Sequence, residues 1–212
     1  MAVFKFSGGP VQASEIYIER RADHEVLRQV RALDYAHVIA PRQMGKTSLL
    51  QRLSRQLTTW GWRCVYVDLS ELKATDEAAW YYILGQRVGD QLTPEQLPTF
   101  TGPNDLKTYL VSVLVHNQPV YPIILLLDEI GNAQKLASCE QFFLTLRSMY
   151  RQPADYPVLK DFSLVLAGTV DPDSLVKDTS NSPFNYGERV PLYDFNVAET
   201  RQLTASLNNI YS

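Results

Sequence analysis

The chain has 212 residues, of which 45% are hydrophobic and 20% charged, and its formal net charge is −3. This length and composition predict one globular domain that needs no disulfide or metal to stabilise its core. The slightly negative charge argues against nucleic-acid binding through bulk electrostatics. The longest apolar run, residues 123–127, is too short to span a bilayer, and the amino terminus has no secretory signal, so we expect a cytoplasmic protein.

Short apolar runs alternate along the chain with longer segments of helical period, a pattern typical of an α/β protein with a mainly parallel sheet. Strands are expected at residues 35–40, 63–69, 122–128, 162–168 and 188–192. The third run is apolar throughout, as a central strand covered on both faces requires. Helices are expected at residues 46–59, from a cap at Thr75 to Leu92, at 104–116 and at 138–151. The polar stretch 171–187 is long for a connection, which indicates either function or mobility.

The first expected strand runs into the sequence APRQMGKTSLL, after which the helical stripe begins. This sequence follows the phosphate-loop pattern G-x-x-x-x-G-K-[ST] except at the first glycine, which Ala40 replaces; the alternative is a chance GKT between a strand and a helix. A loop of this kind turns backbone N–H groups toward a phosphate, and the following helix adds the partial positive charge of its N-terminus. Lys46 would reach the β- and γ-phosphates, and Thr47 would ligate Mg²⁺. The expected nucleotide-binding residues of the loop are Pro41, Arg42, Gln43, Met44, Gly45, Lys46, Thr47 and Ser48.

The third expected strand, in IILLLDEI, delivers an Asp-Glu pair at its carboxyl end, as a Walker B strand does. Open α/β sheets bind ligands at that edge. Asp128 would hold Mg²⁺ through a water, and Glu129 would orient and deprotonate the water that attacks the γ-phosphate. The fourth expected strand ends near Thr169, a candidate to sense the γ-phosphate or that water; the alternative is a threonine that merely ends the strand.

Together these features predict an α/β P-loop NTPase, a three-layer sandwich with a mainly parallel five-stranded sheet. The expected strand order is 5-1-4-3-2, the additional-strand arrangement with a catalytic glutamate.

The segments PRQMGKTSLL, LLLDEI, LVLAGT and SPFNYGERVPLYDF resemble the bacterial AAA-like and STAND families of P-loop ATPases, over roughly residues 7–208. STAND proteins are signal-transduction ATPases with numerous domains. Upstream, YIERRAD resembles a degenerate hydrophobic-Gly-Arg-Glu motif, with Glu19 at the glycine position. The resemblance implies that Tyr17 and Arg20 pack near the adenine of ATP or ADP. It divides the chain into an N-terminal segment, 1–34, near the nucleotide and a core, 35–212.

The resemblance also implies a nucleotide-dependent switch that hydrolyses ATP slowly and self-associates. Members of these families continue into a helical lid and a winged-helix region, so we expect the chain to be the N-terminal portion of a longer protein. Many members also place an arginine just after the fourth strand, where this chain has none. Candidates for a cation at the γ-phosphate are Arg147, Lys177 and Arg189.

Three other functions stay open. An AAA+ DNA-remodelling or replication-initiator ATPase usually carries a basic appendage, which this acidic chain lacks, so nucleic acid is not the expected partner. A P-loop kinase would bind an acceptor substrate, whereas the Asp-Glu pair favours water as the acceptor. A nucleotide-binding scaffold without turnover is the third.

Overall fold

The computed structural model describes residues 9–13, 15–116, 121–150, 156–177, 180 and 182–211. Its centre is a five-stranded sheet in the order β2-β3-β4-β1-β5, with every neighbouring pair parallel. The predicted parallel sheet and its strand order are therefore confirmed. The strands are β1 (Ala36–Ile39), β2 (Arg63–Asp68), β3 (Ile123–Asp128), β4 (Phe162–Gly168) and β5 (Glu188–Arg189).

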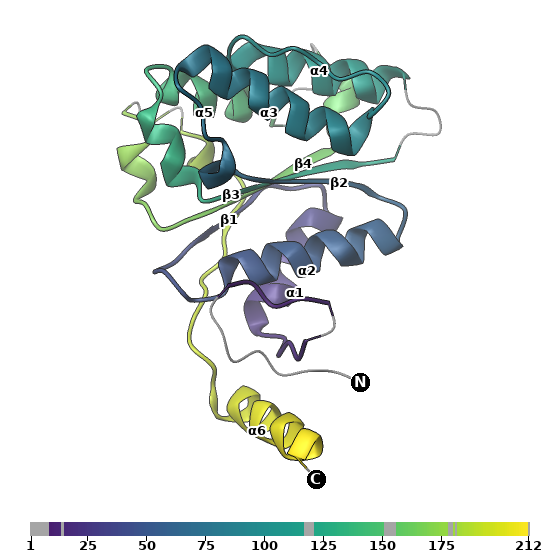
Figure 1. The fold of residues 1–212 in the computed structure, drawn as a ribbon, viewed down its shortest axis with the longest axis vertical. Helices are drawn as coiled ribbons and strands as arrows, with labels where there is room; N and C mark the ends of the chain where they lie inside the picture. Colours follow the sequence, from purple (N-terminus) through teal and green to yellow (C-terminus); the bar gives the residue numbers. More distant parts are fainter. Residues whose placement is uncertain are drawn as a thin grey trace.

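Helices cover both faces of this sheet, which makes three layers (Figure 1). Alternate residues of β3 divide between the faces: Leu125 packs with the helices of one layer and Leu126 with those of the other. This alternation explains why all of β3 is buried and apolar up to its final aspartate. One layer contains α3 (Glu77–Leu92), α4 (Pro103–His116) and α5 (Cys139–Ser148), and the other contains α1 (Arg21–Arg31) and α2 (Lys46–Thr59).

The last helix, α6 (Val197–Tyr211), lies apart from the layers at the end of an extended linker (Figure 1). The described side chains along its first part are mostly exposed. Within the described ranges, no helix is both long enough and apolar enough to cross a membrane. Short 3-10 helices complete the structure: η1 (Leu69–Glu71), η2 (Ile130–Lys135), η3 (Pro157–Asp161), η4 (Pro172–Ser174) and η6 (Pro183–Asn185).

The outer edge of β2 is closed by a side chain of α3. The amide of Gln91 accepts from the Tyr66 N–H at 2.9 Å and donates to the Tyr66 carbonyl at 3.0 Å. An edge strand leaves such groups unpaired unless something covers them. Gln91 thus takes the place of a further strand at this position.

Several element boundaries differ from the predictions for physical reasons. Helix α3 is capped by Asp76, which accepts from the Ala79 N–H at 2.8 Å, and not by Thr75, whose hydroxyl donates to Asp76. Strand β5 ends at Arg189 instead of residue 192: the Val190 N–H still donates to the His37 carbonyl at 2.9 Å, but the following Pro191 fixes its φ at about −65°, outside regular strand geometry. Helix α5 ends at Ser148, and residue 151 of the predicted helix lies outside the described residues.

Helix α1 was not predicted. Its apolar stripe is narrow, consisting of Ala22, Val26 and Val30, and Gln29 is buried on the same helix. The stripe joins the core formed by α2 and the sheet. Helix α1 therefore packs against the sheet beside α2.

Candidate functional site

The loop between β1 and α2 bends sharply at two residues. Gln43 has φ +64° and Gly45 has φ +86°, both in the left-handed region. A Cβ at position 45 would lie 3.1 Å from Nη2 of Arg20, so glycine meets both a conformational and a packing requirement. Arg20 in turn donates from Nη1 to the Met44 carbonyl at 2.7 Å, which fixes the outer side of the loop.

Lys46 lies buried inside this loop, with 5% of its surface exposed. Its Nζ donates to the carbonyls of Ala40 at 2.9 Å and Pro41 at 2.8 Å. Burial lowers the pKa of this ammonium, while the nearby Glu129 and Asp128 raise it. Neutral carbonyls are weaker partners for an ammonium than phosphate oxygens are, so the loop residues fit an anion.

Asp128 ends β3 and is completely buried. Its Oδ1 accepts from the Glu129 N–H at 2.9 Å, its Oδ2 accepts from the Tyr66 hydroxyl at 3.1 Å, and the Thr47 side chain is a third partner. Burial raises the pKa of the carboxyl, and these hydrogen bonds lower it. A threonine hydroxyl that donates its proton to a carboxylate keeps its lone pairs for a cation. Thr47 and Asp128 therefore suit Mg²⁺.

The described residues contain no cluster of three or more His, Cys, Asp or Glu side chains that could hold a metal by themselves. Mg²⁺ characteristically keeps several waters and binds one or two protein groups together with substrate phosphates. A hydroxyl and a carboxylate beside a phosphate loop match that requirement.

Glu129 follows Asp128 with φ +50° and ψ +45°, a left-handed conformation that is strained for a residue with a side chain. It lines a cavity of about 380 Å³ opposite the phosphate loop. We call this the phosphate cavity; its lining residues are Gly9, Pro10, Gln43, Gly45, Lys46, Thr47, Ser48 and Glu129. The predicted general base Glu129 thus lines the same cavity as Lys46 and Thr47.

A second cavity of about 260 Å³ adjoins the phosphate loop and shares Gln43, Gly45 and Ser48 with the first. We call it the base cavity. Its walls come from three parts of the chain: the N-terminal segment, the loop, and the linker with α6. Its further lining residues are Val11, Ile16, Tyr17, Ile18, Arg20, Met44, Asp194, Phe195 and Leu203.

Tyr17 and Arg20 both lie in the base cavity, and each is held by Asp23. The Tyr17 hydroxyl donates to Asp23 Oδ1 at 2.6 Å, and the Arg20 N–H donates to Asp23 Oδ2 at 2.9 Å. The Arg20 guanidinium lies over the Phe195 ring, with Cζ 5.5 Å from the ring centroid. Buried Nε of Arg20 has no hydrogen-bond partner among the described residues.

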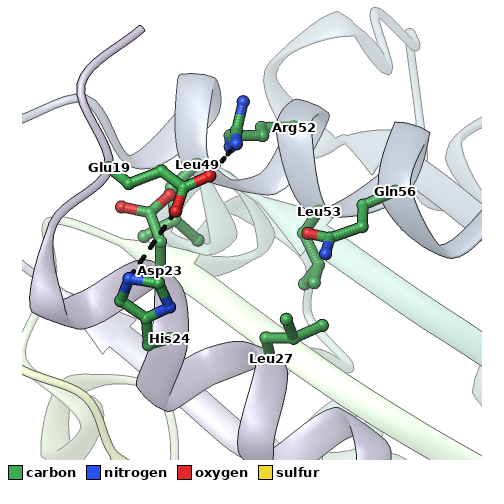
Figure 2. A pocket seen from close by; sticks show the side chains of 8 residues that line it. All are labelled: Glu19, Asp23, His24, Leu27, Leu49, Arg52, Leu53 and Gln56. Carbon is green, nitrogen blue, oxygen red and sulfur yellow. Dashed lines mark hydrogen bonds and ion pairs between the residues drawn. The ribbon is translucent and has the colours of Figure 1, made fainter.

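Glu19, at the position of the motif's glycine, has a structural role on the neighbouring surface. Figure 2 shows its carboxylate between Arg52 of α2, with which it forms an ion pair, and His24 of α1, whose Nε2 lies 3.6 Å from Oε2. The cavity beside these residues measures about 80 Å³ and is much smaller than the two cavities at the phosphate loop. Glu19 thus connects the N-terminal segment to the phosphate-loop helix.

The remaining predicted residues lie outside the two cavities. Thr169 directly follows β4, between the strands that carry the phosphate loop and Asp128, and Arg42 is exposed on the loop. Arg147 is held by Tyr186, to whose hydroxyl it donates at 3.0 Å. Lys177 and Arg189 are exposed. None of these five side chains lines the phosphate cavity.

Sequence reasoning missed Tyr66, Phe195 and Leu203, whereas the approach of the N-terminal segment to this region was an expectation of the resemblance. The Val11 N–H donates to the Ser48 hydroxyl at 3.0 Å. The alternating pattern of β2 predicted a strand, but its register beside β3, which brings Tyr66 to Asp128, is set by the sheet. The only available signal for Phe195 was the segment SPFNYGERVPLYDF itself.

Known proteins match this chain in sequence and in fold. A family model described as "AAA-like domain" matches residues 6–210. The uncharacterized WD repeat-containing protein slr0143 of Synechocystis sp. (strain ATCC 27184 / PCC 6803 / Kazusa) is 30% identical over 221 residues. These cover 94% of this chain and 18% of that protein, so the chain spans less than a fifth of the relative's length.

Solved structures share the fold at low sequence identity. The Walker-type ATPase paby2304 of Pyrococcus abyssi has a TM-score of 0.68 at 13% identity, over 95% of this chain and 61% of that one. Cdc6p of Pyrobaculum aerophilum has a TM-score of 0.60 at 16% identity, over 89% of this chain and 50% of that one. The Aeropyrum pernix ORC1 protein, solved in complex with DNA, has a TM-score of 0.55 at 17% identity, over 88% of this chain and 48% of that one. The fold is thus that of a P-loop ATPase, and the match over residues 6–210 shows that the chain belongs to the AAA-like domain family.

Proposed function

We propose that this chain binds ATP with Mg²⁺, hydrolyses it slowly, and serves as the nucleotide-dependent switch of a longer protein. One observation carries the proposal. Lys46, Thr47 and Glu129 line a single cavity, and Asp128 lies directly behind Thr47 at the carboxyl edge of the sheet. A buried ammonium, a hydroxyl bonded to a buried carboxylate, and a second carboxylate facing them are the groups that phosphoryl transfer to water requires.

Each residue of this group has a distinct role in the proposal. Lys46 binds the β- and γ-phosphates by charge, and Thr47 with Asp128 holds the metal. Bound Mg²⁺ supplies positive charge to the phosphate oxygens. Glu129 accepts the proton of the attacking water and orients it. Tyr17, Phe195 and their neighbours in the base cavity receive the adenine.

Turnover is proposed to be slow because the phosphate cavity has a single cationic lining residue, Lys46, among the described residues. An added arginine at the γ-phosphate is worth roughly 10³ to 10⁵ in rate. Arg147, which was a candidate for that role, is already bonded to Tyr186. We therefore propose that the missing cation comes from a second copy or from another domain.

The switch part of the proposal rests on the base cavity. Phe195 precedes α6 and Leu203 lies within it, and both line the space proposed for the adenine. A bound base would contact them and so favour one position of α6. The WD-repeat relative, of which the match covers 18%, supports a place within a larger protein. Polynucleotide binding stays outside the proposal, because the net charge is −3 and the likeness to ORC1 concerns the fold.

Calorimetry with Mg-ATP, followed by single-turnover hydrolysis at increasing protein concentration, tests this function. We expect binding, a rate well below about 1 s⁻¹, and a rise in rate with concentration if the missing cation comes in trans. Lys46→Ala should weaken binding at least tenfold, roughly 1.4 kcal/mol, whereas Lys160→Ala, at an exposed lysine of η3, should not. Unchanged affinity in Lys46→Ala would refute the site, and a fast, concentration-independent rate would refute the switch.

A further inference from the structure

Tyr66 lies on β2, on the sheet face that α2 covers, close to the carboxylate that ends β3. In the parallel register Tyr66 pairs with Leu126, and Asp68 pairs with Asp128, so Tyr66 sits two residues before the level of Asp128. Its hydroxyl nevertheless reaches forward and donates to Asp128 Oδ2 at 3.1 Å. The proposed chemistry does not use this contact, although it is made to the residue that anchors the metal.

The Asp128 carboxylate has donors on both of its oxygens. Oδ1 accepts from the adjacent Glu129 N–H at 2.9 Å, and Oδ2 accepts from Tyr66, with Thr47 as a further partner. Because the side chain is completely buried, a lost donor would leave a buried anion short of a hydrogen bond. Tyr66 is the one of these donors that comes from a neighbouring strand, so it fixes the carboxylate relative to the sheet.

Tyr66 is itself fixed from two helices. Gln91 of α3 bonds both its backbone N–H and its carbonyl, at 2.9 Å and 3.0 Å. The side chain of Gln51 of α2 lies beside its hydroxyl. Both the backbone and the phenol are therefore restrained, and the hydroxyl is preorganised to donate to Asp128.

We propose that Tyr66 is a positioning residue that orients the Asp128 carboxylate toward the hydrated Mg²⁺ of the bound nucleotide. The inference rests on the proposed function, in which Asp128 and Thr47 hold that ion. Removing a partner that orients a metal-holding carboxylate typically lowers metal affinity by roughly 10- to 100-fold. Asp128 retains two other donors, so we expect an effect at the lower end, about tenfold.

Tyr66→Phe tests the inference, because it removes the hydroxyl and keeps the ring that packs against the core. ATP binding is measured by calorimetry across a series of Mg²⁺ concentrations and, separately, in EDTA. In Tyr66→Phe, the Mg²⁺ concentration at which ATP affinity reaches half of its Mg²⁺-dependent increase should be about tenfold higher than in the parent. The affinity for ATP in EDTA and the melting temperature should change little. Tyr121→Phe, at an exposed tyrosine just before β3, is the matched control and should behave as the parent does.

A second background shows whether the effect passes through Asp128. When Asp128→Asn is already present, adding Tyr66→Phe should not change the Mg²⁺ dependence of ATP binding any further. The reason is that two residues acting through the same contact give non-additive effects. An unchanged Mg²⁺ dependence in Tyr66→Phe alone overturns the inference. So does an equal loss of binding with and without Mg²⁺, which would make the hydroxyl merely structural. If the parent binds ATP no better with Mg²⁺ than in EDTA, the proposed function itself fails, and the inference fails with it.

Discussion

The phosphate cavity and the base cavity are built in different ways. The first depends on buried groups where α2 begins and where β3 ends: Lys46 is 5% exposed and Asp128 is fully buried. The second combines three chain segments, and its aromatic wall, Phe195, is 43% exposed. The difference indicates that the phosphate end is preorganised by the sheet, whereas the base end depends on how the linker and α6 are placed. Variants in the two regions should therefore change different quantities.

The largest effect is expected at the phosphate end. Glu129→Gln should keep Mg-ATP binding and lose about two orders of magnitude in single-turnover rate, because an amide cannot accept the proton of the attacking water. Glu71→Gln, at an exposed ion pair with Arg87, is the control and should retain the parental rate. Hydrolysis at the parental rate in Glu129→Gln would favour the kinase or the scaffold without turnover.

The next effect concerns how the linker is attached to the sheet. Gly187 has φ +77°, and a Cβ there would lie 2.0 Å from the Tyr35 carbonyl of the segment that leads into β1. Gly187→Ala should lower the free energy of unfolding by about 1–3 kcal/mol, as measured by denaturant titration.

Gly61 offers a matched control for that measurement. It has φ +80° but open space around its Cβ position, so Gly61→Ala reports the cost of the backbone conformation alone. We expect Gly187→Ala to cost about 1 kcal/mol more, through its steric clash. Equal costs would mean that β5 moves away from β1 without penalty, and that the base end is less firmly attached than the structure indicates.

The smallest effect is expected at the base end. Phe195→Ala should weaken ATP binding about threefold, since a lost aromatic contact is worth roughly 0.5–1.5 kcal/mol. Binding of inorganic tripolyphosphate, which has no base, should not change. Tyr193→Ala, at a tyrosine that is 72% exposed and lines neither cavity, is the control. Equal losses for ATP and tripolyphosphate in Phe195→Ala would show that the two cavities do not act separately.

The fold could be predicted where the signal is local. The stripe of α2 and the apolar run of β3 are contiguous in sequence, and the alternation of strands and helices predicted the parallel sheet. The strand order followed from assigning the chain to the P-loop class with a catalytic glutamate. Helix α1 was missed although Ala22, Val26 and Val30 stand at helical spacing, because few apolar residues lie among its many charged ones and part of its buried face is polar. Gln29, for example, bonds Glu188 of β5.

The same distinction applies to the candidate site. The loop around Lys46 and the Asp128-Glu129 pair are local motifs, and the structure places both at one edge of the sheet. Their catalytic roles stay predictions. Tyr66 and Phe195 reach the site through strand register and the path of the linker, which no short motif encodes.

The amide of Gln91 on the outer edge of β2 bears on how copies of this chain could associate. An open edge strand invites another chain to add a strand and extend the sheet. The backbone N–H and carbonyl of Tyr66, which an added strand would need, are already hydrogen-bonded to Gln91. The Arg63 side chain of the same strand donates to the Leu92 carbonyl at the end of α3. At the opposite edge, β5 offers only two residues. Association through a continuous intermolecular sheet is therefore disfavoured, and copies would have to meet through side-chain surfaces, where a basic group of one copy can approach the nucleotide of the next.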